Sequence, residues 1–261
     1  MRIVRFSPGP DAGLGQDPLF GVLEDDGVIS IISGDPIYSG IQKTAATIEV
    51  SKVRLLAPII PRSKVVCIGK NYADHAAEMG GVVPDEPIIF LKPNTSVIGP
   101  NDTIVWPEMS ERIDHEAELA IVIGRICKDV PKERVNDVIF GYTIANDVTA
   151  RDLQKKDGQW TRAKSFDTFC PIGPWVDTDF IPGTQKITAT IAGEVKQSAQ
   201  ISDMIFDVPT IINFVSRVMT LLPGDIILTG TPAGIGPMVA GEKATMAIEG
   251  LGELTNKVSA Q

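Results

Sequence analysis

The chain has 261 residues, and its 43% hydrophobic and 22% charged residues are ordinary for a globular protein with a sizeable core. A net charge of −9 argues against nucleic acid or anionic lipid as the main partner. No apolar run approaches the roughly 20 residues of a membrane span, and the three cysteines lack the spacing of a disulfide framework or a zinc site. With a polar N-terminus, these features predict a cytoplasmic protein with no membrane partner.

Residues 1–57 are predicted to form a small N-terminal α/β module. Strands are expected over residues 20–23 and 28–32, joined by a hairpin turn at Asp25-Asp26-Gly27. Pro58 and Pro61 mark the boundary with a second domain of residues 58–261. The module carries no recognisable catalytic motif, so we expect it to pack against the main domain or a second subunit.

The second domain begins with a predicted buried strand over residues 64–69, followed by a helix over residues 71–80 with Asn71 as its N-cap. His75 and Glu78 are three residues apart and would share one face of this helix. Histidine is the usual general base near neutral pH, and a neighbouring carboxylate orients its ring and favours its charged form. The alternative is a chance pair on a surface helix.

Residues 116–124 are predicted to form a β-strand, in which Glu116 and Glu118 point to the same side. Both faces of this strand look buried, and two buried like charges are costly unless something neutralises them. A divalent cation such as Mg²⁺ would do so, because it prefers carboxylate oxygens. The alternative is that both glutamates lie at an exposed strand end and bind nothing. His115 would point to the opposite face and is expected to be structural.

Later segments could bring further charged groups to the same place. A predicted strand over residues 138–148 carries Asp147 at its end, where a carboxylate is well placed to bind a metal. The following residues, Thr149 to Asp152, are typical of a capped helical turn, on which Arg151 and Gln154 could face one site. Lys164 lies among small and aromatic residues, a setting that can hold an ammonium group near an anion.

The C-terminal third is predicted to consist mainly of scaffold. Residues 187–191 and 195–197 form a hairpin, and residues 208–222 form one strongly amphipathic helix capped by Asp207. A strand over residues 225–230 leads into a glycine- and proline-rich loop, residues 231–237, whose exposed backbone amides can hold an anion. The fold expected from all these elements is α+β and rich in strands.

Five motifs in this order resemble the fumarylacetoacetate hydrolase family: residues 69–75, 116–119, 146–154, 163–167 and 228–234. The resemblance spans residues 53–258. It implies a mixed β-roll or sandwich with a few helices, a smaller N-terminal module and a homodimer. It also implies a site for Mg²⁺ or Mn²⁺ and a small keto acid as the substrate.

Carried over position by position, the resemblance also implies roles for individual residues. The metal ligands would be Glu116, Glu118 and Asp147. The catalytic residues would be His75 and Glu78, as a water-activating pair on a lid, and Lys164, which would stabilise an enolate. Substrate-binding residues would be Arg151, Gln154 and Thr231.

One departure from the family pattern bears on the substrate. Some members have an acidic ligand just before the histidine segment, where this chain has Lys70 and Asn71. The chain therefore resembles the three-carboxylate branch, which acts on acylpyruvates and oxaloacetate. The implied activity is metal-dependent hydrolysis of the C–C bond of a 2,4-diketo acid, namely fumarylpyruvate to fumarate and pyruvate, in aromatic-compound catabolism. The alternatives are an oxaloacetate decarboxylase, an isomerase of an unsaturated dioate, and a non-catalytic binding module.

Overall fold

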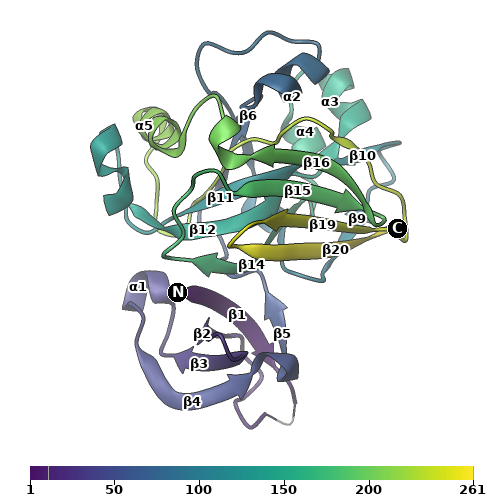
Figure 1. Ribbon diagram of the computed structural model, residues 1–261. Coiled ribbons are helices and arrows are strands. Elements are labelled where there is room, and N and C mark those ends of the chain that lie inside the picture. Colours follow the sequence, from purple (N-terminus) through teal and green to yellow (C-terminus); the bar gives the residue numbers. More distant parts are fainter. Residues whose placement is uncertain (11, 261) are drawn as a thin grey trace.

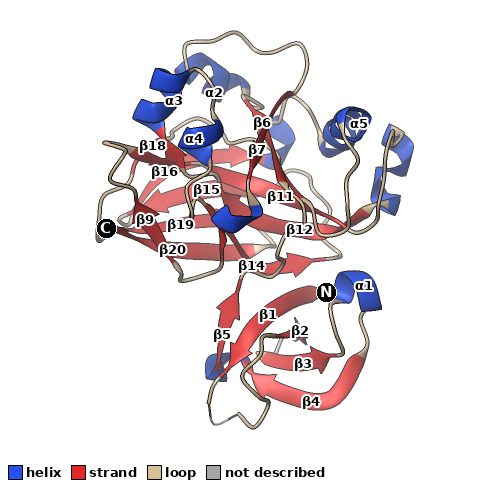
Figure 2. Ribbon diagram, turned by 180° about the vertical axis from the view of Figure 1, so that it is seen from behind, coloured by secondary structure: helices blue, strands red, loops and turns tan. Residues whose placement is uncertain are grey.

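Strands dominate the structure, and three of its short helices gather at one end (Figures 1 and 2). The computed structural model describes residues 1–10 and 12–260. Within these residues, no helix combines the length and the apolar character needed to cross a membrane. The predicted strand-rich α+β fold is confirmed.

The N-terminal module forms a separate lobe beneath the main domain in Figure 1. The predicted hairpin at Asp25-Asp26-Gly27 joins β2 and β3, and the turn is closed by Gly27 with a φ of 82°. The strands of the module are β1 (Arg2–Pro8), β2 (Leu19–Leu23), β3 (Val28–Ile32), β4 (Lys43–Glu49) and β5 (Val53–Leu56). Its helical content is the four-residue α1 (Pro36–Ser39) and a 3₁₀ turn, Val50–Lys52.

The largest sheet runs through both parts of the chain, because β1 of the module pairs antiparallel with β14 of the main domain. The strand order is β4-β3-β2-β1-β14-β12-β11-β17-β6-β7, with β5 on β1 and β8 on β14. Within it, β6 runs parallel to β17, and β11 lies between β12 and β17. The bounds of the main-domain strands are β6 (Val65–Gly69), β7 (Ile88–Lys92), β8 (Val97–Ile98), β11 (Ala117–Ile123), β12 (Ile139–Asn146), β14 (Cys170–Asp177) and β17 (Ile226–Leu228).

Two smaller sheets complete the main domain. A five-stranded sheet has the order β16-β15-β19-β20-β9, and a three-stranded sheet has the order β13-β10-β18. The predicted hairpin of the C-terminal third is β15 and β16. The bounds are β9 (Thr103–Trp106), β10 (Ile113–His115), β13 (Thr149–Ala150), β15 (Lys186–Ile191), β16 (Glu194–Gln200), β18 (Gly236–Pro237), β19 (Lys243–Ile248) and β20 (Gly252–Ala260).

The hydrophobic core explains why β11 is apolar on both faces. Leu119 and Ile121 belong to the main core cluster, together with Met246 and Leu254 from the five-stranded sheet. Ala120, on the opposite face, belongs to a second cluster with β6, β14 and β17 residues. Because β11 is covered on both sides, any polar group at its start is withdrawn from solvent.

The helices are short, and α2, α3 and α4 lie together at one end of the main domain, whereas α5 lies to one side (Figures 1 and 2). Their bounds are α2 (Ala73–Glu78), α3 (Arg151–Asp157), α4 (Thr161–Lys164) and α5 (Val208–Val218). Further 3₁₀ turns cover Asn94–Ser96, Lys132–Asp137 and Ile201–Asp203. The cluster of α2, α3 and α4 frames the pocket described below.

Three local predictions about helices were wrong. Asn71 does not cap α2; its side chain instead donates to the Thr229 and Phe206 carbonyls at 2.7 and 3.0 Å. Thr149 does not cap α3, because its hydroxyl donates to the Asp147 carbonyl at 2.9 Å. The amphipathic helix is capped by Asp207 as predicted, but it ends at Val218 rather than residue 222. Leu221 is instead drawn into a β-bridge with Cys127.

Candidate active site and metal centre

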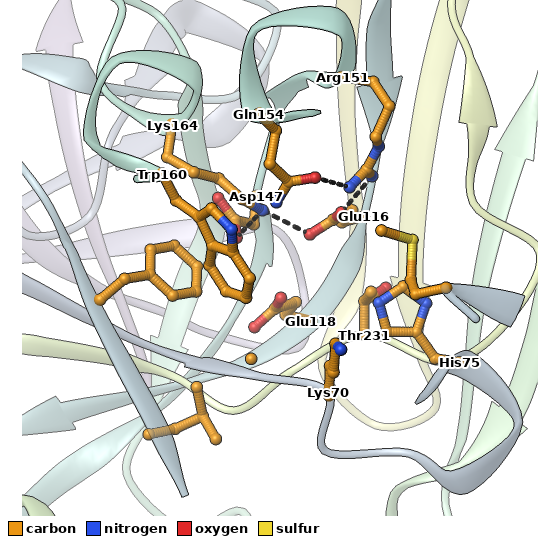
Figure 3. Close-up of a pocket in the computed structure, with 14 residues that line it drawn as sticks. Lys70, His75, Glu116, Glu118, Asp147, Arg151, Gln154, Trp160, Lys164 and Thr231 are labelled. Atoms are coloured by element: carbon orange, nitrogen blue, oxygen red, sulfur yellow. Dashed lines mark hydrogen bonds and ion pairs between the residues drawn. The ribbon is translucent and has the colours of Figure 1, made fainter. Parts of the chain in front are cut away.

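A pocket opens at the end of the main domain where α2, α3 and α4 meet (Figure 3). Every site residue predicted from the sequence lines it, except Glu78. The sheet supplies its floor, the three helices supply its walls, and the loop after β17 supplies Thr231. The fold therefore brings five separate segments, as distant in sequence as residues 68 and 231, to one place.

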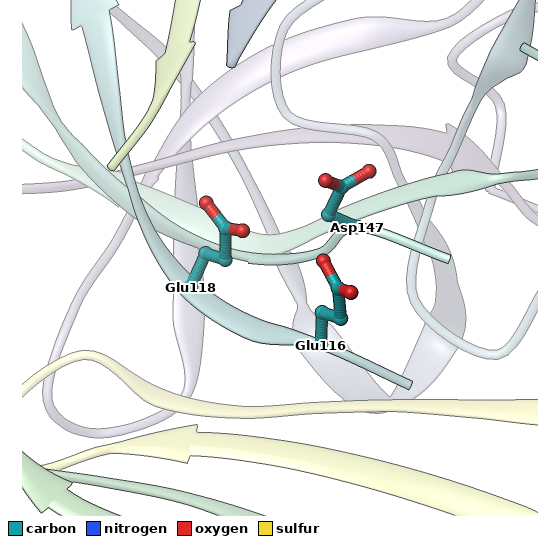
Figure 4. Close-up of side chains that lie close together, drawn as sticks. All are labelled: Glu116, Glu118 and Asp147. Carbon is teal, nitrogen blue, oxygen red and sulfur yellow. The ribbon is translucent and has the colours of Figure 1, made fainter. Parts of the chain in front are cut away.

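Three carboxylates form the centre of the pocket (Figure 4): Glu118 on β11, Glu116 just before β11, and Asp147 just after the neighbouring strand β12. One oxygen of each of Glu116, Glu118 and Asp147 lies within 4.8 Å of the others. Glu116 and Glu118 face the same way, as the strand period predicts, and the Asp147 amide donates to the Glu116 carbonyl at 2.9 Å. All three residues are at most 4% exposed, so the alternative of an exposed strand end was wrong.

Buried cations neutralise two of these carboxylates. Lys164 Nζ donates to Glu116 Oε2 at 2.8 Å and to Asp147 Oδ2 at 2.6 Å. Arg151 donates to Glu116 Oε1 and, at 2.9 Å, to Asp114 Oδ2. Burial by itself would raise the pKa of Glu116, but the charges of Lys164 and Arg151 outweigh burial and lower that pKa well below its ordinary value. Glu116 is therefore held ionised.

Lys92 is a further buried cation that the sequence analysis did not identify. It ends β7, is 1% exposed, and donates to Asp147 Oδ1 at 2.6 Å and to the Val148 carbonyl at 3.2 Å. Asp147 is consequently held by one lysine on each carboxylate oxygen. This arrangement fixes the orientation of a carboxylate that lies just beyond the end of β12.

Glu118 differs from the other two carboxylates. No cation of the described residues lies within ion-pair distance of it, and its Oε2 accepts one hydrogen bond, from the Gly230 amide at 2.6 Å. Burial, followed by the nearby charges of Asp147 and Glu116, raises its pKa well above the ordinary value. The centre thus contains one buried carboxylate, that of Glu118, without a counter-charge. All the potential ligand atoms of the three residues are carboxylate oxygens. This donor set suits a hard divalent cation, which would neutralise Glu118.

A histidine–carboxylate pair lies beside the carboxylates. His75 Nδ1 lies 3.2 Å from Glu78 Oε2, and His75 is only 6% exposed, whereas the Glu78 side chain is 33% exposed. Glu78 also accepts from the Gly234 amide at 3.2 Å, which links α2 to the loop after β17. With Nδ1–H donating to Glu78, Nε2 carries the lone pair that can accept a proton.

Gln197, a second residue missed by the sequence analysis, fixes the position of Thr231. Its amide nitrogen donates to Thr231 Oγ1 at 2.8 Å and to the Pro232 carbonyl at 2.7 Å. Its oxygen accepts from the Ala117 amide at 3.0 Å and lies 3.1 Å from His115 Nδ1. His115 is buried outside the pocket, which agrees with its predicted structural role.

Aromatic and amide groups complete the pocket. Trp160 packs edge-on against Phe90, with ring centroids 5.2 Å apart, and Lys164 Nζ lies 5.0 Å from the centroid of the Phe90 ring. Gln154 Oε1 accepts from Arg151 at 2.6 Å, which leaves the Gln154 amide nitrogen without a partner among the described residues. The pocket therefore combines an apolar wall with several donors that can meet an anion.

Comparison with known proteins identifies the family. A model of the fumarylacetoacetate hydrolase C-terminal domain matches residues 64–259, and a model of an Rv2993c-like N-terminal domain matches residues 1–58. The chain belongs to the fumarylacetoacetate hydrolase family. It is 44% identical to the mitochondrial oxaloacetate tautomerase Fahd2a of Rattus norvegicus, over 80% of this chain and 70% of that protein.

Two solved structures of this family cover the whole of the present chain. The 5-carboxymethyl-2-hydroxymuconate delta-isomerase of Mycobacterium smegmatis is 46% identical, with a TM-score of 0.91 and full coverage of both chains. The maleylpyruvate hydrolase of Sphingobium sp. SYK-6, solved with manganese(II) and pyruvate, is 32% identical, with a TM-score of 0.80, over 100% of this chain and 99% of that one. The family fold therefore extends over the N-terminal module as well.

Proposed function

We propose that this protein is a hydrolase that requires Mg²⁺ or Mn²⁺ and cleaves the C–C bond of an acylpyruvate. The proposed reaction converts fumarylpyruvate to fumarate and pyruvate in the breakdown of aromatic compounds. The observation that carries the proposal is that His75, which is paired with Glu78, and the three buried carboxylates line one pocket. The manganese and pyruvate of the Sphingobium maleylpyruvate hydrolase structure support it.

In this proposal Glu116, Glu118 and Asp147 hold the divalent cation. A cation there would supply Lewis-acid stabilisation of the negative charge on the pyruvoyl oxygens. Lys164 adds a positive charge at the same place, and one of its three N–H donors remains after its bonds to Glu116 and Asp147. Gln154 and Thr231 would donate to substrate oxygens, and Arg151 would keep Gln154 in position.

His75 would act as the general base. It takes a proton from water through Nε2, and the hydroxide adds to the acyl carbonyl carbon. The bond between that carbon and the pyruvoyl methylene then breaks, and its electron pair passes to pyruvate as an enolate. Proton return from His75 to the enolate carbon completes pyruvate, while the acyl fragment leaves as fumarate. Glu78 stabilises the protonated ring between these two proton transfers.

A second candidate is the tautomerisation of oxaloacetate, which the 44% identity to the rat oxaloacetate tautomerase favours. This reaction moves a proton between carbon and oxygen, so it needs a base and enolate stabilisation but no attacking water. Decarboxylation of oxaloacetate and isomerisation of an unsaturated dioate would use the same enolate-stabilising groups.

The test is a substrate panel with saturating Mg²⁺ or Mn²⁺. Fumarylpyruvate, oxaloacetate and an unsaturated seven-carbon dioate are incubated separately with the enzyme, and products are followed by proton NMR. Stoichiometric fumarate and pyruvate would support the hydrolase. If the enzyme accelerates the loss of the enol form of oxaloacetate and cleaves no acylpyruvate, the hydrolase proposal is replaced by the tautomerase.

A further inference from the structure

Lys70 occupies an unusual backbone position at the end of β6. Its φ is +56°, a left-handed conformation that glycine adopts more readily than a residue with a Cβ. Both neighbours hold this corner in place. Asn71 is hydrogen-bonded to the Thr229 and Phe206 carbonyls, and Trp160 packs against Gly69 so closely that a Cβ there would come within 2.8 Å of the indole ring. The corner therefore sets the direction of the Lys70 side chain, and such strained positions concentrate at functional sites.

The Lys70 ammonium group is uncommitted, unlike the other cations of the pocket. Lys164 and Arg151 each bind two carboxylates, whereas Lys70 has no ion-pair or hydrogen-bond partner among residues 1–10 and 12–260. A Cβ on Gly81 would lie 2.6 Å from Lys70 Nζ, so the ammonium group lies against the chain just after α2. Figure 3 shows Lys70 on the same side of the pocket as His75, across from Trp160 and Lys164.

A cation at this position can offset the repulsion between a dianionic substrate and the carboxylates of the pocket. A substrate with a carboxylate at each end must bring its second negative charge into a pocket that already contains Glu116, Glu118 and Asp147. The pyruvoyl end belongs near these carboxylates and Lys164 in the proposed reaction, so the acyl end extends toward His75. Lys70 lies on that side and is free to pair with an anion.

We propose that Lys70 binds the distal carboxylate of the substrate and makes the enzyme selective for dianionic over monoanionic acylpyruvates. This assignment rests on the proposed function, since it takes the acyl end of the substrate to lie beside His75. Phe90 and Trp160 would contact the uncharged middle of the substrate. Lys70 is thus a specificity-determining residue at the rim, separate from the groups that stabilise the enolate.

The first test compares fumarylpyruvate with acetylpyruvate, which has the same pyruvoyl end but no distal carboxylate. Lys70→Met is expected to raise KM for fumarylpyruvate by about tenfold or more, the typical effect of losing a charged hydrogen bond. kcat for fumarylpyruvate and both constants for acetylpyruvate should change by less than about twofold. Lys70→Arg should retain most of the selectivity. Lys155→Met removes one exposed lysine from α3 as the matched control and should leave both substrates unaffected.

The second test measures binding without turnover, by calorimetric titration in Mg²⁺. The ligands are 2-oxoglutarate and 2-oxopentanoate, which differ in a terminal carboxylate or methyl group. The native protein should prefer 2-oxoglutarate, and Lys70→Met should abolish that preference. No preference in the native protein, or an unchanged preference in the variant, would overturn the assignment, as would equal losses on both acylpyruvates. If binding follows the expectation but no acylpyruvate is cleaved, the proposed reaction fails while the role of Lys70 stands.

Discussion

Replacing Lys92 with Met tests the charge balance of the site. Lys92 Nζ donates to Asp147 Oδ1 at 2.6 Å and to the Val148 carbonyl at 3.2 Å, and the residue is 1% exposed. Methionine fills a similar volume but has no charge and no donor. The substitution therefore leaves one Asp147 oxygen buried without its counter-charge.

The cost can be bounded from the contacts that remain. Removing one partner of a buried ion pair typically destabilises a protein by about 3–5 kcal/mol. Asp147 keeps its bond to Lys164, but Lys164 is shared with Glu116 and cannot compensate both carboxylates fully. We therefore expect Lys92→Met to lower the free energy of unfolding of the metal-free protein by about 3 kcal/mol. Mg²⁺ should reduce this loss, because a divalent cation would replace the missing positive charge.

The assay is urea unfolding, with midpoint and slope measured in EDTA and again in Mg²⁺. Lys52→Met is the control, because the Lys52–Glu49 pair is exposed, at 63% and 58% of the side chains, and should change stability by less than about 0.5 kcal/mol. A loss below about 1 kcal/mol in EDTA would refute the buried-pair reasoning. Equal losses in EDTA and in Mg²⁺ would refute a cation at the three carboxylates.

Three further predictions concern metal, base and assembly. Glu118→Gln should weaken Mg²⁺ binding in calorimetry and remove most activity while the protein stays folded, because the amide oxygen can still accept from Gly230; full activity in excess EDTA would contradict the metal site. His75→Ala should lower acylpyruvate hydrolysis by about 10²–10⁴-fold yet spare much of any oxaloacetate decarboxylation, measured on one preparation; equal collapse of both rates would assign the residue to closure or binding. Light scattering at micromolar concentration should give the mass of a homodimer, and a monomer mass would rule that out.

The sequence was informative where periodicity decides the geometry. Alternation along the extended segment of residues 116–118, at the start of β11, places Glu116 and Glu118 on one side whatever the rest of the fold does, and the structure has them there. The approach of Asp147 has a different origin, because it depends on the pairing of β11 with β12, with Ala117 opposite Asn146. Strand periodicity does not specify that register. The sequence marked Asp147 as a carboxylate at a strand end, and the family resemblance joined it to Glu116 and Glu118 as a third ligand.

Predictions from local sequence were wrong or incomplete where a side chain forms hydrogen bonds to residues far away in the sequence. Asn71 has the composition of an N-cap, yet its amide is used by segments 135 and 158 residues away. Lys92 and Gln197 looked like ordinary strand residues, and their partners lie 55 and 80 residues away. A buried polar group needs its hydrogen bonds, but the sequence does not state which remote group will satisfy them. These are the residues that set the finer geometry of the site.

The pocket has two sides that differ in how they are built. The carboxylate side rests on paired strands, with Glu116 and Asp147 each held by buried cations, so its geometry is fixed before any ligand arrives. The opposite side is formed by α2, which is tied to the loop after β17 through the Glu78 contact with the Gly234 amide. Enolate stabilisation needs the fixed geometry of the carboxylate side, because preorganised charges stabilise a transition state without having to reorganise during the reaction. Discrimination among acyl groups can then be altered at Lys70, on the same side as α2, without disturbing the carboxylates. Exchanging Lys70 should therefore change which substrate is accepted, whereas exchanging the residues on the strand side should abolish turnover of every substrate.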